Sequence, residues 1–312
     1  MSTSGRLSAM SPASKTKGAP PDTRDVPCLF CRVEDELIRF QDDPYRVVEC
    51  RKCGLVYVNP RLSSKRLHEM YQEEYWESER ARDFGYTEYL ADKKLYERTY
   101  RRRSSIIGHH LKTPGHVLDV GCAAGFFLSV MREQNWEISG VEIAKPMVEY
   151  AATTLDLPNI VEGDLLSVEV PPKTYDLITL WDVIEHLEDP IAHLRKAHDL
   201  LKDDGCLILE TQNVASLFAR VMGRKWQHYK HEEHLFHFDP RSLARLLEES
   251  GFIMAENTSR QAGKYVSMGF IVERLERIHK VLSRLASPLL LLKNLSLYIN
   301  LQDEMIVVAR KR

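Results

Sequence analysis

Cysteine and histidine side chains at regular spacing are the residues of this sequence best suited to chemistry. Two Cys-x-x-Cys pairs, Cys28 with Cys31 and Cys50 with Cys53, are separated by 18 residues. Two such pairs place four thiolates around one point, which is the tetrahedral ligand set that Zn²⁺ prefers. Metal binding supplies roughly 10–16 kcal/mol of apparent stabilisation to modules with so little core. We therefore expect residues 27–61 to form a structural zinc ribbon, with four unligated thiols as the alternative.

Histidines gather in a second segment, 228–238. Four of the chain's 12 histidines fall within its first ten residues. An imidazole titrates near neutral pH, so it suits a general base that takes a proton from a hydroxyl group. His234 is the expected acid/base residue, assisted by Glu233 or His237. His231, His234 and His237 recur every third residue, which would also suit a metal site, but we favour the acid/base interpretation.

A Glu-His pair offers a second candidate base. Glu185 and His186 follow an apolar segment, 175–181, that we expect to be a strand. Ligands of open α/β sheets bind outside the carboxyl ends of the strands, where this pair would lie. His186 is therefore a second catalytic candidate, and a purely structural role for the pair is the alternative.

The elements that must position these side chains alternate over residues 115–312. Short apolar runs separated by helical patterns indicate a parallel sheet with helices on both faces. We predict an α/β fold with a doubly wound, mostly parallel, seven-stranded sheet. The expected strands are 116–120, 137–142, 160–162, 175–181, 206–211, 252–257 and 304–310. The expected helices are 126–134, 146–155, 191–201 and 241–250.

A glycine-rich turn after the first of these strands indicates a nucleotide-like ligand. Gly121 and Gly125 let the backbone approach a ligand closely. The dinucleotide fingerprint Gly-x-Gly-x-x-Gly would need glycine at 123 and 126, where Ala123 and Phe126 stand. The bulky residue at 126 opposes the close helix packing that NAD-binding folds use. The Gly-Lys-Ser/Thr end of a P-loop is missing as well, so neither motif fits.

The turn resembles the first motif of class I S-adenosylmethionine-dependent methyltransferases, acidic-x-Gly-x-Gly-x-Gly. Asp119, Gly121 and Gly125 match it, and Ala123 replaces the middle glycine. Later landmarks of that family follow in order, and the resemblance covers about residues 110–312. They are Glu142, Gly163-Asp164-Leu165, Tyr175-Asp176-Leu177-Ile178, Trp181-Asp182-Val183-Ile184-Glu185-His186-Leu187, and Leu200-Leu201-Lys202 before Gly205. With the cysteine segment, the arrangement resembles bacterial methyltransferases that carry an N-terminal zinc ribbon.

This resemblance implies a Rossmann-like methyltransferase fold and S-adenosylmethionine as the cofactor. It implies that Glu142 accepts hydrogen bonds from the ribose hydroxyls and that Asp164 reaches the adenine amino group. The residues that it places at the cofactor are Asp119, Gly121, Ala123, Gly125, Glu142, Ile143, Asp164, Leu165 and Asp182.

The histidine-rich segment carries resemblances that bear on the methyl acceptor. Glu233-His234-Leu235 and Phe238 match deoxysugar C-methyltransferases, but His231 and His237 stand where those enzymes have tyrosine. This half of the chain also resembles the ubiquinone-pathway O-methyltransferases. We expect methylation of a small molecule or glycan, with oxygen favoured over sugar carbon. The alternatives are an RNA or protein methyltransferase whose ribbon binds the substrate, and a methyltransferase-like binding protein without activity.

The rest of the chain is assigned by composition and periodicity. Residues 1–26 are rich in Ser, Pro, Gly and Lys and are expected to be a disordered tail. Residues 62–112 are expected to form a helical, tyrosine-rich linker on the acceptor side. The methyltransferase domain spans 113–312, with a helical insertion near 265–301. An amphipathic, basic pattern at 270–301 favours a lid or a homodimer face, with peripheral membrane contact as the alternative.

Composition sets further limits on function. The 312 residues carry a formal net charge of −2, which argues against nucleic-acid binding by bulk electrostatics. The basic run 101–103 is interpreted as a solvated helix face. No apolar run approaches the ~18–20 residues of a membrane span, and the N-terminus lacks the apolar core of a secretory signal. We expect a cytoplasmic protein whose six cysteines are reduced.

Overall fold

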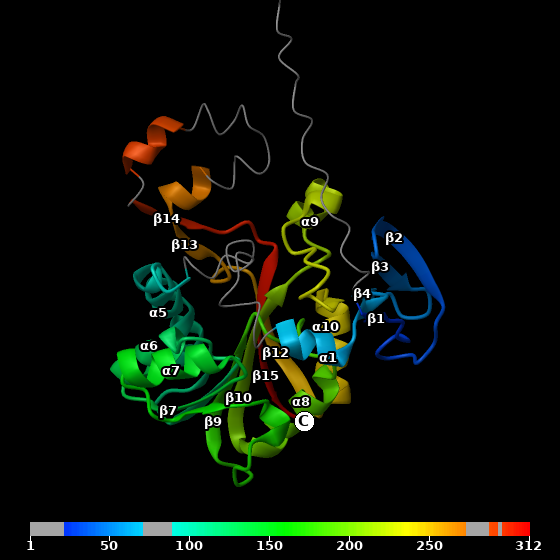
Figure 1. Cartoon of the computed structure of the whole chain (residues 1–312). Coiled ribbons are helices and arrows are strands. Elements are labelled where there is room, and N and C mark those ends of the chain that lie inside the picture. Colours follow the sequence, from blue (N-terminus) through cyan, green and yellow to red (C-terminus); the bar gives the residue numbers. More distant parts are fainter. Residues whose placement is uncertain (1–21, 71–88, 273–286, 293–294) are drawn as a thin grey trace, which may run out of the picture.

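A computed structural model describes residues 22–70, 89–272, 287–292 and 295–312 (Figure 1). At its centre is a seven-stranded sheet of order β12-β15-β10-β9-β6-β7-β8. Neighbouring strands are parallel except for β15, which runs antiparallel to both β10 and β12. The predicted doubly wound, mostly parallel sheet is confirmed. Its strands are β6 (His116–Val120), β7 (Glu137–Glu142), β8 (Ile160–Glu162), β9 (Tyr175–Trp181), β10 (Leu201–Gln212), β12 (Phe252–Thr258) and β15 (Glu304–Lys311).

Helices cover both faces of this sheet (Figure 1). The helix α10 (Pro240–Glu249) shows why these sequences form helices. Asp239 and Ser242 form a capping box at its start, and Leu243, Leu246 and Leu247 bury one face of it. The four helices that the sequence predicted are α6 (Phe126–Glu133), α7 (Lys145–Thr154), α8 (Pro190–Leu200) and α10 (Pro240–Glu249).

The predicted strand boundaries are confirmed residue for residue at 116–120, 137–142, 160–162 and 175–181. The prediction that the next strand starts at 206 is wrong, because β10 begins at Leu201. Leu201 pairs with Tyr175, and the regular pairing with β9 resumes at Cys206 after a shift in register. Residues 203–205, which resemble a turn in sequence, therefore form an irregularity inside β10 and not a loop before it.

The cysteine segment belongs to a second sheet, of order β11-β4-β3-β2. Three of its strands are β2 (Glu36–Asp42), β3 (Tyr45–Cys50) and β4 (Val56–Val58). The fourth, β11 (Phe236–His237), comes from the histidine-rich segment, and its two residues lie opposite Tyr57 and Val56. The ribbon and the histidine-rich segment thus share one sheet, a pairing that the sequence did not predict.

The described part of the linker consists of α1 (Ser64–Glu69) and α5 (Lys93–His110), and residues 71–88 lie outside the described ranges. Ser63 caps α1 by accepting a hydrogen bond from the Arg66 N–H.

The interpretation of 101–103 as a solvated face is wrong for Arg103. Its side chain is 3% exposed, and Nη2 lies 2.6 Å from Oε1 of the fully buried Glu210 on β10. The Arg102 guanidinium lies over the Tyr298 ring at 4.1 Å, and only Arg101 makes exposed ion pairs. A run of like residues therefore serves three different structural contacts.

The insertion near 265–301 was predicted to be helical, but its described part also contains strands. β13 (Lys264–Ser267) pairs antiparallel with β14 (Ser296–Ile299), and a 3₁₀ helix, η4 (Ser287–Leu292), precedes β14. Tyr265 lies opposite Tyr298 with ring centroids 5.2 Å apart. Such a cross-strand aromatic pair stabilises a two-stranded sheet. Most of the amphipathic pattern falls at 273–286, outside the described residues.

The end of the predicted disordered tail is ordered, because β1 (Thr23–Arg24) pairs with β5 (Arg61–Leu62). The rest of the predicted tail, residues 1–21, lies outside the described residues. Nowhere in the described ranges does a helix have both the length and the apolar character required to cross a bilayer.

Candidate functional site

A cavity of about 1620 Å³ opens beyond the carboxyl ends of β6, β7 and β9. The predicted cofactor residues and the predicted acid/base residues line the same cavity, so the fold brings two parts of the sequence together. From the first set these are Asp119, Gly121, Ala123, Glu142, Ile143, Asp164, Leu165 and Asp182, and from the second His186, Glu233 and His234. Gly125 and His237 do not line it.

The glycine-rich turn is held in a conformation that needs its glycines. Gly121 has φ +68°, and a Cβ there would lie 2.6 Å from Cγ2 of Val183. Gly125 has φ +79°, and a Cβ there would lie 2.7 Å from Cδ1 of Leu157. Gly125 therefore shapes the turn from behind the cavity wall. Ala123 adopts φ +46° although it carries a side chain, a strained conformation that the family's middle glycine would avoid.

Glu142 fixes this turn and fits the role implied for it. Its Oε2 accepts a hydrogen bond from the Ala123 N–H at 2.8 Å, and its Oε1 accepts one from the Ala144 N–H at 2.9 Å. Each carboxylate oxygen keeps a second lone pair, and the side chain borders the cavity. A vicinal diol such as that of ribose is a suitable donor pair for these oxygens.

Asp119 lies beside this carboxylate at the end of β6. Its Oδ1 accepts a hydrogen bond from the Thr179 hydroxyl at 2.6 Å. Burial, together with the charge of Glu142, raises the pKa of Asp119 to about 8. Asp119 is thus a buried hydrogen-bonding group at neutral pH and not a freely ionised acid.

Asp164 is paired with a histidine that the sequence did not single out. His193 Nε2 lies 3.0 Å from Asp164 Oδ1, and His193 Nδ1 donates to the Asp189 carbonyl at 2.9 Å. Burial opposes the charged imidazole, but these acceptors raise the pKa of His193, and the pairing lowers that of Asp164. His193 orients the carboxylate implied to reach the adenine. No spacing or motif distinguished it.

Another group that the sequence missed is Lys264, the first residue of β13. Its Nζ lies 3.1 Å from Asp182 Oδ2 and 2.9 Å from Glu304 Oε1. Despite burial, Lys264 and then Arg103 lower the pKa of Asp182 to about 2. A predicted cofactor residue is therefore ionised and already paired within the cavity wall.

The candidate acid/base residues form a tight cluster of Glu185, His186 and His234. The rings of His186 and His234 meet edge to face with centroids 4.7 Å apart. Burial, followed by nearby positive charge, lowers the pKa of His234, and burial also lowers that of His186. Burial and the charge of Asp182 raise the pKa of Glu185 to about 8. Both imidazoles are therefore neutral near pH 7, as a proton acceptor or a metal ligand must be.

His237 has different surroundings. Its ring is fully buried on β11, and Nδ1 lies 3.3 Å from Nε2 of Gln212, which donates to the Phe236 carbonyl. Burial lowers its pKa to about 3. The structure does not bring His237 to the cavity with His234, so a role in positioning β11 fits its surroundings better than contact with an acceptor.

The three histidines that recur every third residue do not converge. His231 pairs with Asp42 of the ribbon at 3.4 Å, and it is absent from the clusters of metal-binding side chains found in the described residues. Those clusters are Cys28/Cys31/Cys50/Cys53 and Glu185/His186/His234.

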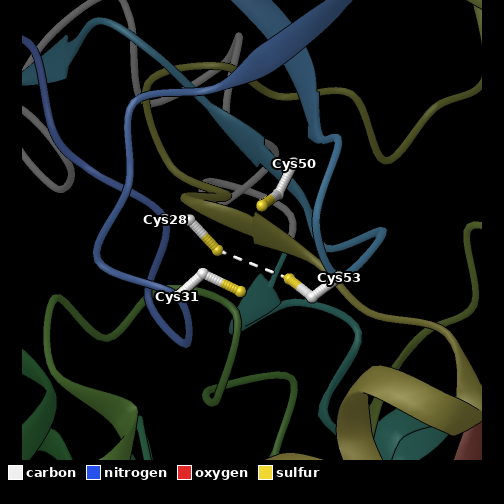
Figure 2. A group of neighbouring side chains, drawn as sticks. All are labelled: Cys28, Cys31, Cys50 and Cys53. Carbon is white, nitrogen blue, oxygen red and sulfur yellow. Dashed lines mark hydrogen bonds between the residues drawn. The ribbon is translucent and has the colours of Figure 1, made fainter.

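The four ribbon cysteines converge on one point (Figure 2). Their sulfur atoms all lie within 4.8 Å of one another, and the Cys28 and Cys53 sulfurs are 3.5 Å apart. Tetrahedral zinc with bonds of about 2.3 Å separates its sulfur ligands by about 3.8 Å, so the thiols fit this ion. The Cys28 carbonyl accepts from the Arg32 N–H, and the Cys50 carbonyl from the Gly54 N–H, which gives the two knuckles the same backbone turn.

Comparisons with known proteins agree with this geometry. Residues 86–257, more than half of the chain, match a family described as a methyltransferase domain. A ubiquinone biosynthesis O-methyltransferase of Xanthomonas campestris pv. campestris is 29% identical over 145 residues, or 41% of this chain. The chain spans 61% of that relative's length. The protein of the same name from Neisseria meningitidis serogroup C is 30% identical over 178 residues, which are 53% of this chain and 74% of that protein.

Solved structures also align with the chain. A SAM-dependent methyltransferase from Archaeoglobus fulgidus has a TM-score of 0.46 and 20% identity over 72% of this chain and 99% of that one. The PH0226 protein from Pyrococcus horikoshii has a TM-score of 0.47 and 15% identity over 78% and 96%. Because the matched family model covers more than half of its residues, the chain belongs to the methyltransferase-domain family.

Proposed function

We propose that this methyltransferase methylates a hydroxyl oxygen of a polar small molecule or glycan, and that the His186–His234 pair activates this hydroxyl. The observation that carries the proposal is the shared cavity, which Glu142, Asp164, His186 and His234 all line. The ubiquinone O-methyltransferases similar to this chain support oxygen as the acceptor atom.

Different residues bind the cofactor and activate the acceptor. The cofactor supplies an electrophilic methyl group on sulfur. Glu142 and Asp164 hold its ribose and adenine, and the turn at Gly121 closes around it. A hydroxyl group needs to lose its proton as it attacks, and the His186–His234 pair assists that loss. Much of the remaining rate comes from holding donor and acceptor at attack distance.

The test is a panel of acceptors with His234→Ala as the diagnostic variant. Nucleotide sugars, phenols and catechols are incubated with the cofactor, S-adenosylhomocysteine release is measured, and the methylated atom is identified by NMR. General acid–base groups contribute about 10²–10⁴-fold, so we expect kcat to fall by about that factor in His234→Ala with the Kd for S-adenosylhomocysteine unchanged. Methyl on carbon would contradict the proposal, as would full turnover by the variant. His231→Ala is the matched control, because that histidine does not border the cavity.

We also propose that the four ribbon cysteines hold a structural zinc ion. The sulfur geometry supports this, and Cys28 and Cys50 are 0% and 1% exposed. No sequence feature assigns the site a reaction, so the expected contribution is stability of the ribbon.

Removal of this zinc should damage acceptor activation more than cofactor binding. β11 pairs with β4, and the residues on either side of it, Leu235 and Phe238, lie in the shared core. We expect Cys50→Ser to lose stoichiometric zinc by mass spectrometry and to lose turnover, with S-adenosylhomocysteine still bound. Cys206→Ala, a buried cysteine outside the cluster, should keep its zinc. Wild-type metal content in Cys50→Ser would contradict the assignment.

A further inference from the structure

We infer that Glu185, His186 and His234 form a site for a divalent first-row metal ion on the acceptor side of the cavity. The inference rests on the proposed function, because it states how the His186–His234 pair acts on the hydroxyl. One donor atom from each of the three side chains lies within 4.8 Å of the other two. A cation with bonds of about 2.1 Å places neighbouring ligands about 3 Å apart and opposite ligands about 4.2 Å apart, so a small inward movement completes the set.

The environment of each side chain matches that of a ligand. The ring of His186 donates a hydrogen bond to the backbone carbonyl of Glu233. This hydrogen bond fixes the orientation of the imidazole and leaves its second nitrogen as the one that can bind a metal ion. The Thr211 hydroxyl lies 2.9 Å from Glu185 Oε2 and orients that carboxyl in the same manner. His234 is 5% exposed, and its buried Nδ1 has no hydrogen-bond partner among the described residues.

The Nδ1 of His234, unpaired within the described ranges, is the reason to expect a bound ligand beside it. A buried ring nitrogen without a partner costs roughly 1–3 kcal/mol, and a metal bond or the acceptor itself would satisfy it. One ring nitrogen of His234 lies within 4.8 Å of a donor atom of Glu185 and of His186, and all three residues border the cavity.

The site leaves coordination positions open. Two imidazoles and one carboxylate are a donor set suited to Zn²⁺, Fe²⁺ or Mn²⁺, and three protein ligands are typical of sites that also bind a substrate. The neighbouring Glu233 is held by Lys230 at 3.2 Å and stands outside the cluster. Lys264 pairs with Asp182 and Glu304, and Lys230 pairs with Glu233, so both of these lysines have carboxylate partners.

The cation acts on the acceptor as a Lewis acid. The acceptor hydroxyl takes an open position and its pKa falls. Its proton passes to the Glu233 carboxylate, which borders the same cavity. The oxygen then forms the new bond to the methyl carbon as the carbon–sulfur bond of the cofactor breaks, and the sulfur keeps that electron pair.

The test is a Mn²⁺ titration, followed by EPR, of protein that carries one zinc ion per chain, so that the four thiolates are loaded and the three-residue site is free. Mn²⁺ competes poorly for four thiolates. We expect one saturable site per chain, weakened more than about tenfold in both His234→Ala and Glu185→Gln. His231→Ala, in the same segment but outside the cluster, should bind Mn²⁺ as the wild type does. The Kd for S-adenosylhomocysteine reports that each variant is folded.

The outcomes separate this inference from the proposed function. Absence of saturable Mn²⁺ binding, or equal binding in all variants, overturns the metal site. If turnover of a hydroxyl acceptor nevertheless continues, the proposed function stands with imidazole alone as the base. Saturable binding that depends on His234 and Glu185, without turnover of any hydroxyl acceptor, keeps the site and removes the function.

Discussion

Glu142→Ala should weaken S-adenosylhomocysteine binding at least about 100-fold, because two hydrogen bonds to a carboxylate contribute about 1.5–3 kcal/mol each. The substitution also frees the Ala123 and Ala144 N–H groups that the carboxylate holds, so the turn loses its support. Isothermal titration calorimetry measures the change.

The matched control is Glu137→Ala on the same strand. Glu137 opens β7, and its side chain is 72% exposed and distant from the cavity lining. Its removal should leave the Kd unchanged. Equal Kd values for Glu142→Ala and the wild type would show that the cofactor is held elsewhere, and the assignment of the cavity would fail.

Arg103→Met should lower the free energy of unfolding by about 3–5 kcal/mol, the usual effect of removing one partner of a buried ion pair. Arg103 joins α5 to Glu210 near the carboxyl end of β10, and both side chains are almost inaccessible to solvent. Glu210 would keep its burial and lose its nearest positive charge. Urea unfolding monitored by circular dichroism gives the change.

A second substitution separates the charge from the packing. Arg103→Met with Glu210→Met removes both charges, so much of the lost stability should return. Arg101→Met, which breaks an exposed pair with Glu133, should cost no more than about 1 kcal/mol. If Arg103→Met is as stable as Arg101→Met, the buried pair contributes nothing and the role given to α5 is wrong.

The sequence predicted those parts of the molecule in which local pattern and fold agree. The strands at 116–120 and 175–181 are apolar runs ended by turns, and buried parallel strands require that pattern. Glu142 is predicted to bind the cofactor because it ends a strand at a position where the family has an acidic residue, and that role stays a prediction. The Cys-x-x-Cys pairs could be found because their spacing alone fixes the knuckle.

Other features depend on contacts between distant residues, which no local pattern records. His193 has the sequence context of an ordinary helical residue, and only the fold places it against Asp164. Arg103 looks like its exposed neighbours until α5 is laid over β10. His237 shared the histidine periodicity of the segment, but strand pairing turned it away from the cavity.

The shared sheet of the ribbon has a consequence for synthesis of the chain. Val56 and His237 lie opposite each other but are about 180 positions apart in the sequence, so their contact is strongly non-local. A growing chain completes β2, β3 and β4 long before it contains β11, and the edge of β4 must wait without its neighbour. Unpaired strand edges recruit other chains. A message that ends before codon 236 would yield an aggregation-prone fragment, in which the ribbon presents an open edge to other nascent chains.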